Sequence, residues 1–210
     1  VYTEKMAGIR DILDLPIMYR IWQFPFAYQK MKPVRKDQSL AEAVKVLDVG
    51  CGLGTNAQYF THADYLGLDI NERYISNTRQ RYPGEFLQCD VCTYQPEDGQ
   101  AFDYIFLNSF LHHIDDENTC KILNCLHGLL TPNGSIHILD LVLPENRCIA
   151  QWLVKKDRGD FARPIKRWRE IFSDVFSTIH CEPFAVRGLG IKLWSMVYFK
   201  GAQRAAGVAV

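Results

Sequence analysis

The sequence lacks an excess of charge of either sign, since its 24 Lys and Arg residues are balanced by 24 Asp and Glu residues. A chain without net charge produces no overall field that would attract a polyanion, so nucleic acid binding is not indicated. Apolar runs of the roughly 18 residues that a membrane-spanning helix needs are also missing, which predicts no transmembrane segment. The sequence has no repeats, and its hydrophobic content of 48% is ordinary for a globular protein. We therefore expect a single domain over residues 1–210.

The seven cysteines do not favour a disulfide framework. Their number is odd and they are scattered through apolar segments, which is typical of reduced, buried thiols in a cytoplasmic protein. Cys89 and Cys92 form a C-x-x-C pair, but a structural zinc site needs a second such pair, so we predict no metal site. The chain starts at Val1 rather than Met, and charges stand where a signal peptide has its apolar segment. We expect residues upstream of Val1 to be missing, which leaves open whether they include a leader.

Short β-rich runs alternate with helix-like stretches from residue 44 onward, the pattern of a parallel sheet covered by helices. Only a short turn with two glycines separates the last two runs. That turn is too short for a crossover helix, so these two strands should form an antiparallel hairpin. The fold class is therefore α/β, with a mostly parallel sheet and an antiparallel edge. The predicted strands are 44–49, 65–69, 85–89, 102–108, 134–141, 176–184 and 191–199.

Two of the helices between these strands have capping residues. Asn71 is expected to cap a helix that ends at Arg81. Asp115 or Asp116 is expected to cap a second helix, which ends at Leu130 before a Thr-Pro-Asn-Gly turn. Side-chain oxygens at these positions accept hydrogen bonds from the first N–H groups of a helix.

The prefix before the first strand is rich in aromatic residues and is interrupted by Pro16, Pro25 and Pro33. Prolines remove a backbone donor and break helices, so we expect short helices or a lid over the site. A helix docked on the sheet is the plainer alternative. The expected divisions are an N-terminal helical lid or prefix at 1–43, a cofactor-binding core at 44–141, a helical insertion over the acceptor site at 142–175, a hairpin at 176–200 and a flexible tail at 201–210.

The segment VLDVGCGLGTNAQYF places three glycines after a buried strand and before a predicted helix. Glycines there let the backbone approach a ligand closely at the carboxyl end of the sheet. Thr55 stands where a dinucleotide fingerprint has its third glycine, and no P-loop Lys follows, so a nucleoside without a pyrophosphate fits better. Asp69 ends the next strand, where a carboxylate can accept hydrogen bonds from a ribose diol. Capping of the following helix is the other interpretation of Asp69.

These motifs resemble those of the class I S-adenosylmethionine-dependent methyltransferases. The likeness covers residues 44–141 and continues with CDV at 89–91, FDYIFLNSFLHHIDD at 102–116 and LLTPNGSIHILD at 129–140. It implies a Rossmann-like sheet of seven strands in the order 3-2-1-4-5-7-6, with strand 7 antiparallel and helices on both faces. It also implies S-adenosyl-L-methionine as the cofactor and S-adenosyl-L-homocysteine as the product.

The resemblance also assigns cofactor-binding residues. Residues around the first glycine loop would face the methionine part, Asp69 the ribose, the pair after the third strand the adenine, and Asn108 would lie near the sulfonium. Cys51 and Asn133 depart from the family's usual residues, but neither change removes a main-chain contact. The implied residues are Asp48, Gly50, Cys51, Gly52, Gly54, Asp69, Ile70, Asp90, Val91 and Asn108.

Candidates for a catalytic base are few, because methyl transfer needs a base only where the nucleophile carries a proton. His112 and His113 are adjacent and must point in different directions, so at most one of them should face the acceptor. Asp140, near the carboxyl end of its strand, and Tyr19 in the prefix are the further candidates. For Asp140, a hydrogen bond at the strand end is the plainer role.

A local excess of basic residues lies at 147–170. Such a run is usually a solvated helical face. Our hypothesis is that it receives an anionic acceptor, an anionic lipid surface or an acidic carrier protein, with Arg163 and Arg167 as the residues to test.

The function expected from the sequence is methyl transfer from S-adenosylmethionine to an oxygen or nitrogen of a small, partly apolar or aromatic acceptor. One alternative is a protein of the same fold that binds S-adenosylmethionine without methyl transfer, as a sensor or as a catalyst of a rearrangement. The other is a nicotinamide-dependent oxidoreductase, against which the Thr55 mismatch already counts.

Overall fold

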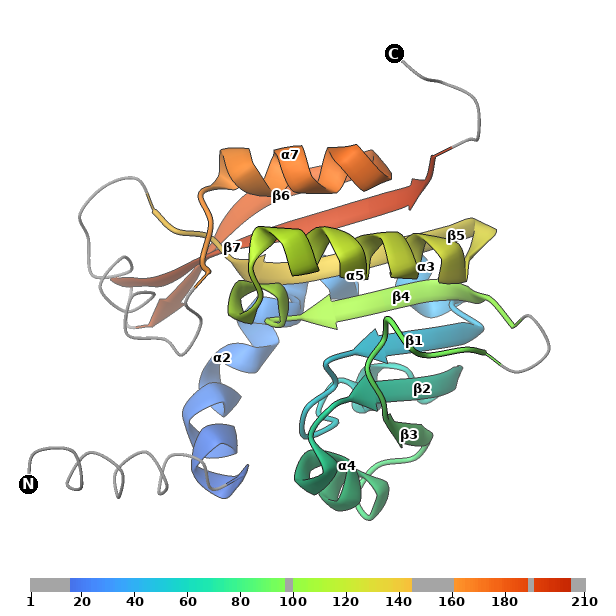
Figure 1. Cartoon of the computed structure of the whole chain (residues 1–210). Helices are drawn as coiled ribbons and strands as arrows, with labels where there is room; N and C mark the ends of the chain where they lie inside the picture. Colours follow the sequence, from blue (N-terminus) through green and yellow to red (C-terminus); the bar gives the residue numbers. More distant parts are fainter. Residues whose placement is uncertain (1–15, 97–99, 145–160, 189–190, 205–210) are drawn as a thin grey trace, which may run out of the picture.

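The computed structural model describes residues 16–96, 100–144, 161–188 and 191–204, and for 16–25 only the backbone (Figure 1). Its seven strands form one sheet in the order β3-β2-β1-β4-β5-β7-β6, which confirms the expected fold. The first five pair in parallel, and β7 is antiparallel to both of its neighbours. The strands are β1 Lys45–Val49, β2 Asp64–Asp69, β3 Glu85–Gln88, β4 Phe102–Asn108, β5 Leu130–Leu141, β6 Phe176–Gly188 and β7 Ile191–Gln203.

Helices cover the two faces of the sheet. Within the described chain, none is long and apolar enough to cross a membrane. Asn71 caps α4, because its side chain accepts hydrogen bonds from the N–H groups of Arg73 and Tyr74. Asp115 caps α5 by accepting from the N–H of Asn118, so both predicted helix starts are confirmed. The helices are α2 Pro16–Lys36, α3 Ser39–Glu42, α4 Glu72–Arg79, α5 Asp116–Leu129 and α7 Ile165–Val175, with 3₁₀ turns at Ala57–Tyr59 and Leu111–His113.

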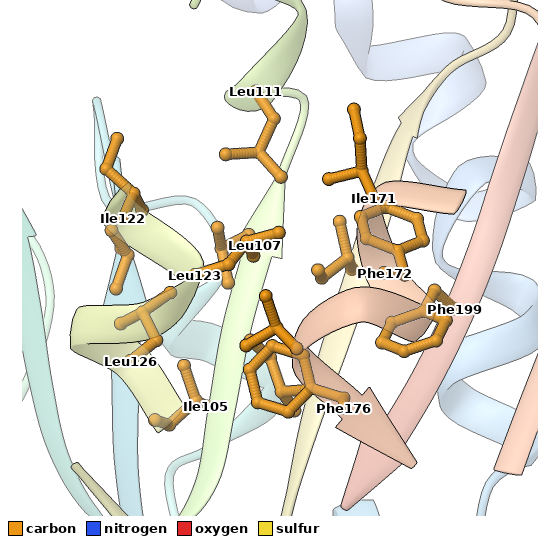
Figure 2. Close-up of a cluster of buried hydrophobic side chains, with 14 of the residues drawn as sticks. Ile105, Leu107, Leu111, Ile122, Leu123, Leu126, Ile171, Phe172, Phe176 and Phe199 are labelled. Carbon is orange, nitrogen blue, oxygen red and sulfur yellow. The ribbon is translucent and has the colours of Figure 1, made fainter. Parts of the chain in front are cut away.

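The hydrophobic core is divided by the sheet into two clusters. On one face, α5 and α7 pack against β4, β5 and β7 (Figure 2). Leu123 and Phe172, which come from the two helices, are both fully buried there. The ring of Phe172 stacks on Phe199 of β7, with 4.4 Å between the ring centroids. On the other face, Met31 and Val34 of α2 join the second cluster.

Four features differ from the expectations drawn from the sequence. The helix α2 continues through Pro25 and Pro33 instead of breaking at each proline, because packing of its buried residues on the sheet outweighs the lost backbone hydrogen bonds. The glycine loop is followed by the 3₁₀ turn Ala57–Tyr59 rather than by an α-helix, since few residues separate it from β2. The expected turn at 131–134 is an irregularity within β5: Leu130 and Ser135 pair with Phe102 and Tyr104. Residues 201–203, expected in the flexible tail, belong to β7, which extends to Gln203.

Replacing Phe172 by Ala tests how much the α7 contact contributes to stability. We expect Phe172→Ala to lower the free energy of unfolding by about 3–5 kcal/mol, because it removes a fully buried ring and leaves a cavity. Lys166→Ala, an exposed position on the same helix, should change it by no more than about 0.5 kcal/mol. Urea denaturation followed by circular dichroism measures both, and equal losses would contradict the packing described for α7.

Candidate active site

The glycine loop leaves the carboxyl end of β1 in a conformation that favours glycine. Gly50, Gly52 and Gly54 have φ angles of 67°, 54° and 70°, in the left-handed region that other residues rarely adopt. The N–H groups of Gly50 and Cys51 both donate to the carbonyl of Leu68, at 2.8 and 3.0 Å, which fastens the loop to β2.

The three glycines are needed for different reasons. A Cβ on Gly54 would lie 2.1 Å from Cγ2 of Thr78 in α4, and one on Gly50 would lie 2.4 Å from the ring of Phe110. These two glycines therefore permit close packing. A Cβ on Gly52 would meet nothing nearer than the carbonyl oxygen of Gly50, at 4.0 Å. Gly52 thus borders open space, and it is the member of the loop that a ligand could approach directly.

Asp69 lies beside this loop at the end of β2. Its Oδ2 accepts a hydrogen bond from the N–H of Gly52 at 2.9 Å, and its Oδ1 accepts one from the N–H of Asn71 at 2.8 Å. Asn71, not Asp69, is the cap of α4. The carboxylate is only partly buried, so both of its oxygens keep lone pairs that can face a ligand beside the loop.

The remaining residues expected around the nucleoside lie at the ends of β2 and β3. Ile70 is exposed, and Val91 is buried next to the exposed Asp90. Asp90 accepts a hydrogen bond from the N–H of Cys92 through Oδ1, at 2.9 Å. The N–H of Cys89 donates to the carbonyl of Asp69 at 3.1 Å, which brings the end of β3 next to the end of β2.

Asp48 and Asn108 lie on neighbouring strands and are joined by a residue that the sequence did not single out. Asp48 is fully buried, and its Oδ2 accepts hydrogen bonds from the Tyr65 hydroxyl at 2.5 Å and the Asn56 amide at 3.0 Å. The Oδ1 of Asn56 in turn accepts from the amide of Asn108, at 2.9 Å. A buried carboxylate demands such donors, but nothing in the sequence showed that Asn56 and Tyr65 would supply them.

Two oxygens in this chain of contacts have no partner. Among the described residues, Oδ1 of Asp48 and Oδ1 of Asn108 are buried and accept no hydrogen bond. Burial raises the pKa of Asp48 to about 6, although the Tyr65 and Asn56 donors oppose the shift. Unsatisfied buried acceptors are costly. Two of them lie near the carboxyl ends of β1 and β4, at the edge of the sheet from which the glycine loop leaves. They form a set of acceptors suited to a protonated amino group.

His112 and Asp140 form a buried pair at the same edge of the sheet. The Nδ1 of His112 lies 2.6 Å from Oδ1 of Asp140, and the two side chains are 3% and 0% exposed. The other Asp140 oxygen accepts from the N–H of Leu111 at 2.8 Å. Burial alone would raise the pKa of Asp140, but His112 and the backbone N–H groups of Leu111 and Leu141 hold that pKa below its ordinary value.

An ionised Asp140 fixes the proton of His112 on Nδ1 and leaves the Nε2 lone pair available. Nε2 has no hydrogen-bond partner among the described residues. This is the arrangement of a general base oriented by a carboxylate. The ring of His113 lies beside that of His112, with 4.0 Å between centroids, and is exposed. The side chain of Tyr19 lies outside the described residues.

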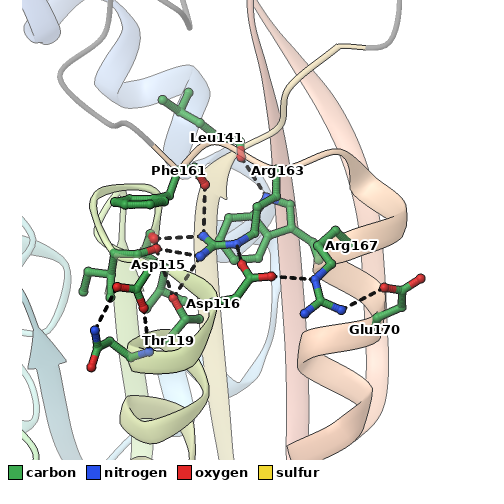
Figure 3. Close-up of polar contacts among 12 residues, drawn as sticks. Asp115, Asp116, Thr119, Leu141, Phe161, Arg163, Arg167 and Glu170 are labelled. Carbon is green, nitrogen blue, oxygen red and sulfur yellow. Dashed lines mark hydrogen bonds and ion pairs between the residues drawn. The ribbon is translucent and has the colours of Figure 1, made fainter.

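The hypothesis that Arg163 receives an anionic partner is wrong. Arg163 is buried and its guanidinium is bound within the protein, to Asp116 and to backbone carbonyls (Figure 3). Arg167 is half-exposed, but it is paired with Asp116 and Glu170. The basic residues of this run at 147–160 lie outside the described residues. The sequence misled here because a charge run on a helix does not show which cations turn inward.

A cavity lies at the amino ends of β1 and β2, away from the glycine loop. It has a volume of about 790 Å³, lies along β3 and is lined by Lys45 and Asp64, the first residues of β1 and β2, among others. It is at the opposite end of these strands from residues 50–54, so we do not assign it to the active site. In the described parts of the chain, no three His, Cys, Asp or Glu residues are grouped so that they could hold a metal ion.

The chain is similar in sequence to known methyltransferases. The family model described as "Methyltransferase domain" matches residues 46–134. The chain is 29% identical over 188 residues to the trans-aconitate 2-methyltransferase of Variovorax paradoxus, which is 73% of this chain and 70% of that protein. It is 35% identical over 108 residues to an uncharacterized methyltransferase of Mycobacterium tuberculosis, which is 49% of this chain and 53% of that protein.

A solved structure shows the same fold. The N-methyltransferase NodS from Bradyrhizobium japonicum, in complex with S-adenosyl-L-homocysteine, superposes with a TM-score of 0.65 over 92% of this chain and 91% of that one, at 13% identity. The chain spans less than half of two further trans-aconitate 2-methyltransferases, 42% and 47% of their lengths.

The raised pKa of Asp48 predicts a pH-dependent stability. The folded protein holds this proton more tightly than the unfolded chain, because the pKa is about 6 when folded against 3.8 ordinarily. The contribution of Asp48 to the free energy of unfolding is therefore most favourable below about pH 4. It falls by about 3 kcal/mol as the pH rises to about 6, at about 1.36 kcal/mol for each pKa unit.

Asp48→Asn removes the titrating group and isolates this effect. We expect the free energy of unfolding of the variant, taken relative to that of the wild type, to rise by about 3 kcal/mol between about pH 4 and about pH 7. Denaturant unfolding of both proteins at the two pH values measures the difference. A difference that is the same at both would show that Asp48 titrates normally.

Proposed function

Because this chain belongs to the class I S-adenosylmethionine-dependent methyltransferases, we propose that it methylates an oxygen or nitrogen of a small, partly apolar or aromatic acceptor. The observation that carries this proposal is the His112–Asp140 pair, whose unpartnered Nε2 lies at the same edge of the sheet as the glycine loop. The bound cofactor supplies an electrophilic methyl group on a sulfonium.

The residues around the loop fit this cofactor. The unpartnered oxygens of Asp48 and Asn108 would accept hydrogen bonds from its ammonium group. Asp69, held by Gly52 and Asn71, would accept from the ribose hydroxyls. The exposed Ile70 and the buried Val91 would flank the adenine.

His112 would act on the acceptor. Its Nε2 would take the proton of a hydroxyl or amine as the nucleophile attacks, and Asp140 would stabilise the resulting imidazolium. An acceptor that is already ionised needs no base. The Variovorax relative is named for trans-aconitate, a carboxylate. A carboxylate acceptor should therefore react without His112, and it serves as the comparison for acceptors that must lose a proton.

The prefix supports an apolar acceptor. Figure 1 shows α2 beside the carboxyl ends of β1 and β4, and Sδ of Met31 lies 3.8 Å from the amide nitrogen of Asn108. Phe26 packs edge-on against Trp194 of β7, with 5.1 Å between centroids. The thioether of Met31 thus lies next to the residue assigned to the sulfonium, and the same helix carries the Phe26 ring of an aromatic pair, which supports a partly apolar acceptor over a wholly polar one.

The proposal is tested by following S-adenosylhomocysteine formation with trans-aconitate, simple phenols and primary amines as acceptors. Product formed with any of them, in step with the methylated acceptor, supports a methyltransferase of small molecules. Binding of S-adenosylmethionine without turnover of any acceptor would favour the alternative of a binding protein. Calorimetric titration with NAD tests the oxidoreductase alternative, which binding of NAD without binding of S-adenosylmethionine would favour.

Gly52→Ala tests the cofactor site. The new methyl group meets no atom nearer than 4.0 Å, and alanine at this φ of 54° costs only about 1–2 kcal/mol of strain. We therefore expect the protein to fold and its affinity for S-adenosylmethionine to fall at least about tenfold, that is by about 1.4 kcal/mol. Gly128→Ala is the matched control, since no heavy atom lies within 4 Å of its Cβ. Calorimetric titration should find unchanged affinity in the control, and unchanged affinity in Gly52→Ala would place the cofactor elsewhere.

His112→Asn tests the base. For acceptors that must lose a proton, we expect kcat to fall by about 10²–10⁴-fold, while the dissociation constant for S-adenosylmethionine stays the same. His180→Asn, at an exposed position of β6, is the control and should keep the wild-type kcat. A wild-type rate for His112→Asn with a phenol or amine would refute the assignment.

A further inference from the structure

We propose that Arg163 is a positioning residue for His112: it holds the Leu111–His113 turn in the conformation that keeps His112 on Asp140 and Nε2 available. This inference rests on the proposed function, in which His112 is the base. Arg163 itself does not touch the acceptor in this proposal, and acts through the backbone on both sides of the histidine.

All five N–H donors of Arg163 have acceptors. Nε donates to Oδ1 of Asp116, the first residue of α5. Nη1 donates to the carbonyls of Leu111 at 3.1 Å and Phe161 at 3.0 Å. Nη2 donates to the carbonyl of Ile114 at 2.6 Å and to the hydroxyl of Thr119 at 3.2 Å. A single planar group therefore binds the loop before α5, the helix itself and the segment before α7 (Figure 3).

These contacts hold the backbone on both sides of His112. Arg163 binds the carbonyl of Leu111, just before His112, and that of Ile114, two residues after it. The carbonyl of His112 itself accepts from the N–H of Phe161, whose own carbonyl is bound by Arg163. The N–H of Leu111 is bound by Asp140. The turn is thus fixed at each peptide that sets the direction of the imidazole.

The turn needs such an external clamp. A 3₁₀ segment of three residues has poor hydrogen-bond geometry and little stability of its own. The guanidinium is 5% exposed and lies over the ring of Trp168, 4.7 Å from its centroid, and Trp168 is bound to the carbonyl of Leu141 at the end of β5. Arg163 is therefore held, through Trp168, at the end of the strand that carries Asp140. Both residues of the His112–Asp140 pair are thus positioned from the same strand.

Arginine is required at this position for a geometric reason. Lysine would keep the charge but has three donors on one atom, which cannot reach carbonyls arranged around a planar fork. A buried cation is also costly unless all its donors are paired. Its pairing here with three loop carbonyls, beyond the single carboxylate of Asp116, indicates that the charge serves to fix the backbone.

The tautomer of His112 is the readout, because a purely structural role of Arg163 would not change it. We expect ¹⁵N NMR of histidine-labelled wild-type protein to show His112 as the Nδ1–H tautomer alone. In Arg163→Lys, we expect the Nε2–H tautomer to appear at about one fifth or more of the population. Arg169→Lys, an exposed cation on α7, is the matched control and should resemble the wild type.

A second variant separates positioning from stability. Asp116→Asn weakens the ion pairs of Arg163 and Arg167 but keeps every carbonyl contact, so it should lower the melting temperature and leave the tautomer unchanged. If Arg163→Lys does not fold, Thr119→Val is measured instead. That variant removes one acceptor of the Arg163 guanidinium, so the second tautomer should appear in it as well. A single wild-type tautomer in a folded Arg163→Lys, or in Thr119→Val where that variant replaces it, overturns the proposal.

This outcome is independent of whether His112 is the base. The NMR signals need no acceptor, so a second tautomer in Arg163→Lys supports positioning even where His112→Asn retains full activity, a result that would refute the proposed base alone. Conversely, loss of activity in His112→Asn together with an unchanged tautomer in Arg163→Lys would keep the base and refute its positioning by Arg163.

Discussion

Burial of the Asp140 carboxylate is the constraint on which the arrangement of the site depends. An ionised group with no exposed surface must be surrounded by donors, and here these are His112 and the backbone N–H groups of Leu111 and Leu141. Two of the three come from the loop after β4. The requirement for donors thus draws that loop onto the end of β5 and places a histidine with one available nitrogen at the carboxyl edge of the sheet.

Asp48 on β1, which β4 separates from β5 in the sheet, shows the opposite balance. Its burial is equal, but one of its oxygens has no donor in the part of the chain that the structure describes. Its pKa is raised to about 6, whereas that of Asp140 is lowered. The difference is physical: Asp140 is satisfied by groups of the folded chain, whereas Asp48 and Asn108 retain unused acceptors. Incomplete pairing costs stability and leaves binding energy for a cationic ligand. In the proposed site, the fully hydrogen-bonded Asp140 supports the base, whereas the unused acceptors of Asp48 and Asn108 are kept for the cofactor.

The sequence predicted what is local. Apolar runs located the strands, Asn71 and Asp115 marked the helix starts, and the short glycine turn required an antiparallel hairpin. It did not predict features decided by distant residues. Pro25 and Pro33 stay within α2 because the helix packs on the sheet, and Asn56, Tyr65 and Arg163 acquire their partners only after folding. The composition of a segment cannot show which polar side chain turns inward, because this depends on partners from other segments, such as the carbonyl of Leu111, 52 residues before Arg163.

Through Arg163, the segment before α7 positions a side chain in the loop after β4, which comes much earlier in the sequence. The β4 loop, β5 and α7 are adjacent in space, since Val142 forms a bridge with Arg163 and α7 packs on the same face as α5. Hydrophobic packing of Trp168 and Phe172 fixes the helix, but packing alone is not directional and would tolerate small rotations of the loop. Planar, fully paired hydrogen bonds are directional. Buried apolar surface therefore supplies the stability of this region, and the guanidinium supplies the precision that orientation of an imidazole requires.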